Sequence, residues 1–217
     1  MSNKVFIFDL DGVIVDTAKY HYLAWKNLAN ALGFDFTEEQ NEQLKGVSRV
    51  KSLEILLSLG KVELSEEKKR ALLTEKNEEY LEYVDKMTAD EILPGIQIAL
   101  NFLDDNHIKY ALGSASKNAP LILKKVGLFD RFTAIVDGND VSKAKPDPEV
   151  FLIAAKKLNK TPNNCIVIED AQAGIQAANN AQMTSIGIGD KKVLSEANHI
   201  LSSTEKFTID FIKKLIA

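Results

Sequence analysis

Cysteine and histidine are scarce in this chain, which has one cysteine and three histidines in 217 residues. A single cysteine, Cys165, excludes an internal disulfide, and the scattered His21, His107 and His199 lack the spacing of a zinc site. Cys165 begins the apolar run Cys165–Ile168. We therefore expect it to be a small buried hydrophobic side chain rather than a nucleophile.

Clusters of positive charge and long apolar segments are also missing. Lys and Arg are interspersed with Asp and Glu at a formal net charge of −4, so there is no basic stripe of the kind that binds nucleic acid. The first apolar run, Val5–Phe8, is too short for a secretory signal or a membrane span. Neither G-x-x-x-x-G-K-S/T nor G-x-G-x-x-G, the glycine-rich nucleotide-binding patterns, occurs. We expect a cytoplasmic monomer with no nucleic acid or membrane partner.

Short β-branched or aromatic runs alternate with segments of helical period along most of the chain. With 45% hydrophobic and 27% charged residues, the composition is that of a globular protein. The alternation predicts βαβ units, hence an α/β fold with a Rossmann-like parallel sheet and helices on both faces. The predicted strands are Val5–Phe8, Tyr110–Leu112, Ala134–Val136, Cys165–Ile168 and Ser185–Ile188.

One long stretch breaks this alternation. From about Thr17 to Glu91 the apolar residues recur only at helical spacing, so we predict an all-helical cap domain inserted after the first strand. The predicted domains are a core of residues 1–16 and 92–217 and a cap of residues 17–91. Thr17 and Ile92–Gly95 border the two linkers and are candidate hinges.

The clearest chemical signal is a buried strand that runs into two carboxylates. Val5–Phe8 is followed by Asp9 and Asp11, two residues apart, and then by Gly12. The strand period of two puts both acids on one side, and ligands of open α/β sheets bind beyond the carboxyl ends of the strands. Two adjacent carboxylates repel unless a cation or a proton separates them, and Mg²⁺ prefers oxygen ligands while it keeps phosphate bound. The pair indicates a metal-assisted phosphate site.

Three further motifs follow later strands. Glu169-Asp170 supplies a second acid pair at the same sheet edge. Ser114-Ala115-Ser116-Lys117-Asn118 leads into a helix with Pro120 in its opening turn, where hydroxyl and backbone N–H groups can hold an anion, although the serines could simply be helix caps. The loop of residues 143–148 presents Lys145, a point charge that can neutralise phosphate. The four signals together favour a phosphoryl-transfer site.

In this order the motifs resemble those of the haloacid dehalogenase superfamily, and the match spans nearly the entire chain. The resembling segments are Asp9-Leu10-Asp11-Gly12-Val13, Ser114-Ala115-Ser116, Lys145-Pro146 and Glu169-Asp170. The resemblance implies that Asp9 is a nucleophile forming an aspartyl-phosphate and that Asp11 is the general acid and base. It implies that Ser114 and Lys145 stabilise the transferred group. The implied Mg²⁺ site comprises Asp9, Asp11, Glu169 and Asp170, with Asp11 binding through its carbonyl.

The helical insertion resembles the cap of the hexose-phosphate mutases within this superfamily. The resembling cap residues are Thr17, His21, Trp25, Lys45, Gly46, Val47, Ser48, Arg49, Ser52, Lys76 and Asn77. The core segments 114–118 and 172–177 match as well. Two departures from the family pattern are Ala171 and Gly113, and neither touches the expected chemistry.

The cap resemblance implies a substrate-binding role for specific residues. The expected substrate-binding residues are Thr17, His21, Trp25, Lys45, Gly46, Arg49, Ser52, Lys76, Ala115, Ser116 and Asn118. Arg49, with Ser116 and Asn118, would grip the distal phosphate of a sugar phosphate, while His21 and Lys76 would orient Asp11 or the sugar hydroxyls. β-Glucose 1,6-bisphosphate would be the phosphoryl donor and intermediate, and the cap would be a lid that excludes water.

Two other interpretations stay open. A sugar-phosphate phosphatase of the same superfamily would share Asp9, Asp11, Lys145 and Asp170 but pass the phosphoryl group to water, and it would have no use for a second phosphate site at Arg49. A non-catalytic descendant would have lost a nucleophile, a metal ligand or the lysine, and this chain retains all of them.

Overall fold

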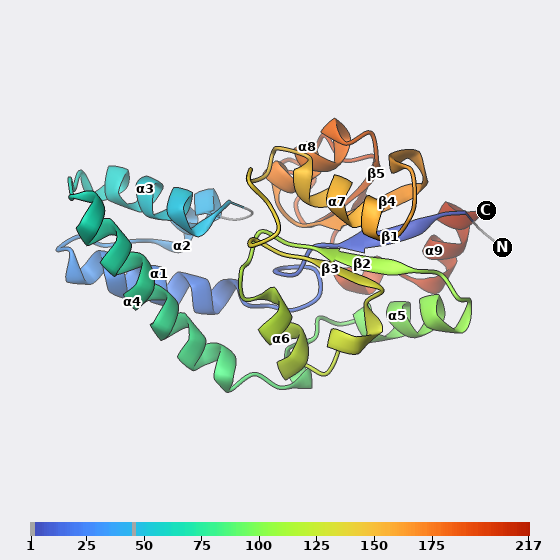
Figure 1. The fold of residues 1–217 in the computed structure, drawn as a ribbon, viewed down its shortest axis with the longest axis horizontal. Helices are drawn as coiled ribbons and strands as arrows, with labels where there is room; N and C mark the ends of the chain where they lie inside the picture. The colour runs from blue at the N-terminus through green and yellow to red at the C-terminus, as the bar shows by residue number, and fades with distance from the viewer. Residues whose placement is uncertain (1–2, 45–46) are drawn as a thin grey trace.

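The computed structural model describes residues 3–44 and 47–217, which form an α/β core and a helical lobe (Figure 1). In these residues the core is built on a six-stranded, all-parallel sheet in the order β3-β2-β1-β4-β5-β6. The strands are β1 Val5–Phe8, β2 Tyr110–Gly113, β3 Ala134–Val136, β4 Cys165–Glu169, β5 Thr184–Ile188 and β6 His199–Leu201. The predicted α/β class with a parallel sheet is confirmed.

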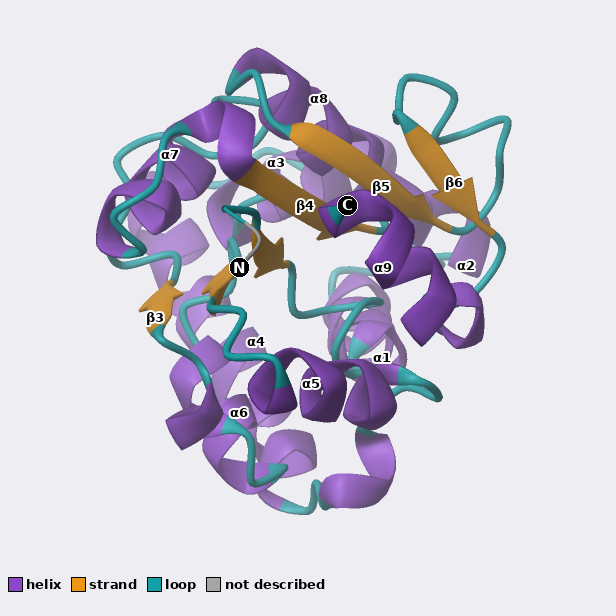
Figure 2. Ribbon diagram, turned by 90° about the vertical axis from the view of Figure 1, so that its right-hand side faces the viewer, coloured by secondary structure: helices purple, strands orange, loops and turns teal. Residues whose placement is uncertain are grey.

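Helices cover both faces of the sheet, because successive side chains of the buried strands point to opposite sides. Phe6 and Phe8 of β1 pack in one hydrophobic cluster with side chains of α5 (Ile96–Asp105), α6 (Ala119–Lys125) and α9 (Ile209–Ile216). Val5 and Ile7 pack in a second cluster with α7 (Glu149–Lys157) and α8 (Gln172–Asn180). Figure 2 shows the sheet between these two helical layers. Cys165 lies buried in the second cluster, as predicted.

A sixth strand was not among the predicted ones. β6, His199–Leu201, pairs parallel to β5 at the sheet edge, and its residues are exposed or only partly buried. Such a short edge strand lacks the continuous apolar run that marks a strand buried on both faces. Its position depends on the partner strand more than on its own composition.

The helical lobe has a hydrophobic core of its own. It contains α1 Ala18–Ala31, α2 Glu38–Asn41, α3 Arg49–Gly60 and α4 Glu66–Asp85. Trp25 and Leu28 of α1 pack there with Leu53 and Leu56 of α3. The described residues between 17 and 91 contain no strand, in agreement with the all-helical pattern, while the domain limits themselves stay a prediction. Of the helices within the described ranges, none has both the length and the apolar character needed to cross a membrane.

The two connections between the core and the helical lobe run side by side. Val15 pairs antiparallel with Ile92, and the Leu93 N–H donates to the Ile14 carbonyl at 2.9 Å. The carboxylate of Glu91 accepts a hydrogen bond from the Tyr20 hydroxyl at 2.6 Å. The lobe therefore joins the core through a narrow, hydrogen-bonded neck, which is the geometry expected of a hinge.

Candidate active site

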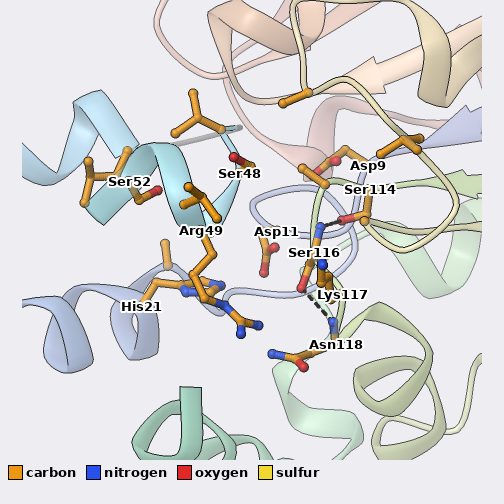
Figure 3. A pocket seen from close by; sticks show the side chains of 18 of the residues that line it. Asp9, Asp11, His21, Ser48, Arg49, Ser52, Ser114, Ser116, Lys117 and Asn118 are labelled. Atoms are coloured by element: carbon orange, nitrogen blue, oxygen red, sulfur yellow. Dashed lines mark hydrogen bonds between the residues drawn. The ribbon is translucent and has the colours of Figure 1, made fainter. Parts of the chain in front are cut away.

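The strand ends meet the helical lobe at a cavity of about 330 Å³ (Figure 3). Because the strands are parallel, the residues that follow β1, β2 and β4 gather at one sheet edge. The predicted residues that line the cavity are Asp9, Asp11, His21, Trp25, Arg49, Ser52, Lys76, Ser114, Ala115, Ser116, Asn118 and Asp170. Thr17, Lys145 and Glu169 do not line it. Lys45 and Gly46 lie outside the described residues.

A buried ion cluster lies beneath the candidate nucleophile. The Lys145 Nζ donates to Asp9 Oδ1 and to Glu169 Oε1, each at 2.6 Å, and the exposed fractions of Asp9 and Glu169 are 6% and 0%. Although burial alone would lower the pKa of the Lys145 ammonium, the charges of Asp9 and Glu169 raise it. A permanently charged lysine against Asp9 Oδ1 can neutralise negative charge that builds up on a phosphoryl group bound there.

The Glu169 side chain lies in this ion cluster and does not line the cavity. Its Oε1 atom binds Lys145, and its Oε2 atom accepts the Ala171 N–H at 2.6 Å. A Cβ atom on Gly174 would lie 1.8 Å from Glu169 Oε1, so only glycine leaves room for the carboxylate at this point of α8. Burial raises the pKa of Glu169, and Lys145 opposes that shift. Of the second acid pair, Asp170 alone faces the cavity.

Asp11 has the environment of a proton-transfer group. Its Oδ1 atom is buried and has no hydrogen-bond partner within the described residues. Burial, with the charge of Asp9, raises the pKa of Asp11 from 3.8 to about 7, against the opposing charges of Lys145 and Lys76. A carboxyl group with such a pKa is available in both protonation states near neutral pH, which is what a general acid and base requires.

The oxygen atoms around Asp9 fit a magnesium ion. Asp9, Asp11 and Asp170 all line the cavity, and Lys145 engages only Oδ1 of Asp9. A Cβ atom on Gly12 would lie 2.2 Å from Asp170 Oδ2, so the Asp170 carboxylate packs directly against the backbone between Asp11 and Val13. The described residues hold no cage of three or more His, Cys, Asp and Glu side chains. Mg²⁺ commonly takes one or two carboxylates and fills its remaining positions with water and phosphate, so this set suits it.

Replacing Gly12 with alanine is expected to weaken Mg²⁺ binding by roughly tenfold or more, because the new methyl group must displace the Asp170 carboxylate. Isothermal titration calorimetry with Mg²⁺ measures this directly. Gly127→Ala is a matched control: Gly127 has nearly the same backbone angle (φ +73°, against +77°), yet nothing lies within 4 Å of its Cβ position. Both variants should lose about 1–2 kcal/mol of stability. Equal Mg²⁺ affinity in the two would argue against Asp170 as a ligand.

The hydroxyl groups after β2 form a chain of turns. Ser114 Oγ accepts the Ser116 N–H at 3.1 Å, and Ser116 Oγ accepts the Asn118 N–H at 3.3 Å. Each hydroxyl therefore keeps its own proton to donate to an acceptor in the cavity. Pro120 lies in the first turn of α6, as predicted. The neighbouring Lys117 also lines the cavity; it was part of the predicted motif but was not assigned a role.

The helical lobe contributes a stack of aromatic and cationic groups. The Lys76 Nζ lies 2.9 Å from His21 Nδ1, and it lies over the rings of Trp25 and Tyr80 at 4.7 and 4.8 Å from their centroids. Burial, together with Arg49, lowers the pKa of Lys76 to about 7. Burial, together with Lys76, lowers the pKa of His21 well below its ordinary value. A neutral His21 that accepts at Nδ1 carries its proton on Nε2.

A second cationic region lies away from Asp9. Arg49, at the start of α3, reaches into the cavity from the helical lobe and points toward Asn118 of the core (Figure 3). Burial lowers the pKa of Arg49, yet the guanidinium stays charged at neutral pH. The Asn118 Nδ2 donates to Asn77 Oδ1 at 2.9 Å, a direct contact between the core and α4. Cationic or donor groups of both the core and the helical lobe therefore line the cavity.

Known proteins resemble this chain over nearly its whole length. The family model for haloacid dehalogenase-like hydrolases matches residues 3–182. A Bacillus subtilis protein named β-phosphoglucomutase is 42% identical over 211 residues, or 96% of this chain and 93% of that protein. A crystal structure of β-phosphoglucomutase from Clostridium difficile has a TM-score of 0.93 and 46% identity, with 97% of this chain and 96% of that chain covered. A Thermotoga maritima phosphorylated carbohydrates phosphatase is 28% identical over 98% of this chain and all of its own length.

Proposed function

The chain belongs to the haloacid dehalogenase-like hydrolase family, and from this premise we propose that it acts as a β-phosphoglucomutase. The reaction interconverts β-D-glucose 1-phosphate and glucose 6-phosphate through a phospho-Asp9 enzyme and β-glucose 1,6-bisphosphate. The observation that carries the proposal is a cavity with Asp9 at one end and Arg49 with Asn118 at the other. Two phosphate sites suit a bisphosphate intermediate, whereas a phosphatase needs one. Two relatives named β-phosphoglucomutase, which are 42% and 46% identical to this chain, support the proposal.

Asp9 and Asp11 divide the chemistry between them. In the first half-reaction the 6-hydroxyl of β-glucose 1-phosphate attacks phospho-Asp9, Asp11 takes the hydroxyl proton, and Asp9 is released as a free carboxylate. The bisphosphate then reorients in the cavity, so that its 1-phosphate faces Asp9. In the second half-reaction Asp9 attacks the 1-phosphoryl group, and protonated Asp11 gives its proton to the departing sugar oxygen, which yields glucose 6-phosphate and phospho-Asp9.

The surrounding groups stabilise the transferred phosphoryl group. Lys145, fixed 2.6 Å from Asp9 Oδ1, and the hydroxyl of Ser114 offer positive charge and a donor from the core side. Mg²⁺ held by Asp9, Asp170 and the Asp11 carbonyl supplies charge neutralisation when bound. His21, as a neutral Nε2 donor, can orient Asp11 or a sugar hydroxyl.

The helical lobe explains why the phosphoryl group is transferred to a sugar hydroxyl faster than to water. The cavity is enclosed between the core and α1, α2, α3 and α4, and the neck allows the lobe to close on a bound substrate. Arg49 and Asn118 come from opposite sides of the cavity, so a phosphate held by both stabilises the closed arrangement. Substrate binding is thereby linked to the exclusion of water.

A coupled assay for glucose 6-phosphate tests the proposal. Purified protein is given Mg²⁺, a trace of glucose 1,6-bisphosphate and either β-glucose 1-phosphate or its α anomer, and free phosphate is followed in parallel. A mutase forms glucose 6-phosphate from the β anomer alone with little free phosphate. Prompt release of phosphate with little glucose 6-phosphate would make the protein a sugar-phosphate phosphatase instead.

Replacing Arg49 with alanine is expected to lower kcat/KM for β-glucose 1-phosphate by roughly 10²-fold, since the distal phosphate loses its charged partner. The same assay measures this loss. Arg70→Ala, which removes an exposed guanidinium from α4, is the matched control and should leave the rate unchanged. If Arg49→Ala kept full mutase activity, the cavity would have no distal phosphate site at this residue.

A further inference from the structure

The loop that carries Lys145 is long and is held by the core on either side of residues 141–145. The Gly138 N–H donates to the Ser116 carbonyl at 3.4 Å, and the Asn180 Nδ2 donates to the Pro146 carbonyl at 3.1 Å. The loop runs from the end of β3 at Val136 to the start of α7 at Glu149. Lys145 must nevertheless reach Asp9 and Glu169 at 2.6 Å each, in a site where it is almost completely buried. Some part of the structure has to fix this loop, because a lysine side chain by itself has many conformations.

Glu149 makes the hydrogen bonds that hold the segment just before Lys145, at Ser142 and Lys143. Its Oε2 atom accepts the backbone N–H groups of Ser142 and Lys143 at 2.8 and 2.7 Å. Its Oε1 atom accepts the Ser142 hydroxyl at 3.0 Å. In the described part of the chain these backbone N–H groups have no other acceptor within hydrogen-bonding distance. The backbone hydrogen bond from Lys143 is the main reason that the pKa of Glu149 is lowered, so the carboxylate is charged at neutral pH.

The same helix also supports Lys145 from below. Glu149 is the first residue of α7, and two residues later the Phe151 ring lies beneath the Lys145 ammonium, with Nζ 4.8 Å from the ring centroid. Phe151 is itself fixed, because it is fully buried and packs against Gly113 at the end of β2. The first turn of α7 therefore anchors the loop through Glu149 and places an apolar floor under the lysine through Phe151.

We propose that Glu149 is a positioning residue for phosphoryl transfer, acting through Lys145. Without its carboxylate, Ser142 and Lys143 lose their acceptor, and the loop is free to shift so that Lys145 no longer meets Asp9 Oδ1. The same loop lines the cavity at Val141, Ser142, Lys143 and Ala144, opposite the helical lobe. This inference rests on the proposed role of Asp9 and Lys145 in phosphoryl transfer.

The test is a double-mutant cycle with Lys145. Glu149→Ala is expected to lower kcat by roughly 10- to 100-fold, with KM for β-glucose 1-phosphate changed by less than about threefold, since a displaced catalytic group affects the transition state most. In a Lys145→Ala background the same substitution should cause no further loss. Glu149→Asp, which keeps the charge, should recover part of the rate. Glu66→Ala removes a first-turn carboxylate from α4 and is the matched control, with activity unchanged.

The outcomes separate this inference from the proposed function. Unchanged kcat in Glu149→Ala, or an equal loss with and without Lys145, would overturn the positioning role. If the alanine variant does not fold, as judged by thermal unfolding, the cycle is run with Glu149→Leu, which keeps the bulk of the side chain but has no acceptor, and the same two criteria apply. Should the wild-type protein release phosphate rather than form glucose 6-phosphate, the mutase proposal fails. The cycle can then still be measured through phosphate release, because Asp9 and Lys145 serve both reactions.

Discussion

Replacing Asp9 with asparagine is expected to lower the rate of glucose 6-phosphate formation by at least about 10⁴-fold, because the amide cannot attack phosphorus. No other described carboxylate combines contact with Lys145 and exposure to the cavity, since Glu169 lies behind the lysine and away from the cavity. The variant should also fail to form a phosphoenzyme when it is given glucose 1,6-bisphosphate. Steady-state kinetics measure the first effect, and intact-protein mass spectrometry measures the second.

The Asp9→Asn variant should keep its fold. In the wild type one ammonium, Lys145, faces two carboxylates, and the substitution leaves the Lys145–Glu169 pair in place. No uncompensated lysine charge is created, so the large penalty for breaking a buried pair does not apply. The thermal unfolding midpoint should therefore stay close to that of the wild type, and the loss of activity can be assigned to chemistry.

Asp137→Asn is the matched control for this experiment. Asp137 follows β3 as Asp9 follows β1, and it is almost as buried, at 8% exposed against 6%. Its Oδ1 atom accepts the Asn139 N–H, a bond that an asparagine oxygen can also accept. This variant should retain most of its activity. A phosphoenzyme that still formed in Asp9→Asn would place the nucleophile elsewhere.

Much of the core could be predicted from the sequence because its strands are buried on both faces. Continuous apolar runs such as Val5–Phe8 are local signals, and they place the residues that follow them at the sheet edge. The proximity of Asp9, Ser114 and Asp170 could therefore be predicted from the sequence. β6 could not, because an edge strand of three partly exposed residues has no such run.

The parts of the site that depend on tertiary contacts were harder to predict. The cap residues His21, Arg49 and Lys76 were assigned by resemblance, since helical periodicity alone does not say which charges turn inward. Glu169 was grouped with the metal ligands by resemblance, and its contact with Lys145 could not be predicted from the sequence. The proposed role of Glu149 has no sequence signal, because two of its partners are backbone N–H groups. The monomeric state, the cytoplasmic location and the absence of a nucleic acid partner stay predictions.

Replacing Asp11 with asparagine is expected to lower kcat by about 10²–10⁴-fold, the usual value of a general acid and base. Asparagine keeps the shape of the side chain and leaves the backbone carbonyl unchanged, so Mg²⁺ affinity should change far less than kcat. Calorimetry and the glucose 6-phosphate assay test the two parts separately. A variant that lost Mg²⁺ binding and activity to the same extent would assign Asp11 to the metal site through its side chain instead of to proton transfer.

The raised pKa of Asp11 predicts a second effect of the same substitution, a change in how stability depends on pH. Because the folded-state pKa of about 7 lies above the reference value of 3.8, the folded protein binds more protons than the unfolded chain between these pH values. The stability contributed by protonated Asp11 is thus complete below about pH 4 and is lost as pH rises toward 7. Asparagine does not titrate, so in Mg²⁺-free buffer the variant should gain stability relative to the wild type between about pH 5 and about pH 8.

Urea unfolding at the two pH values measures this difference. Parallel stability curves for the two proteins would mean that burial and Asp9 do not hold the proton on Asp11, and the general acid and base would have to be sought among the other groups that line the cavity.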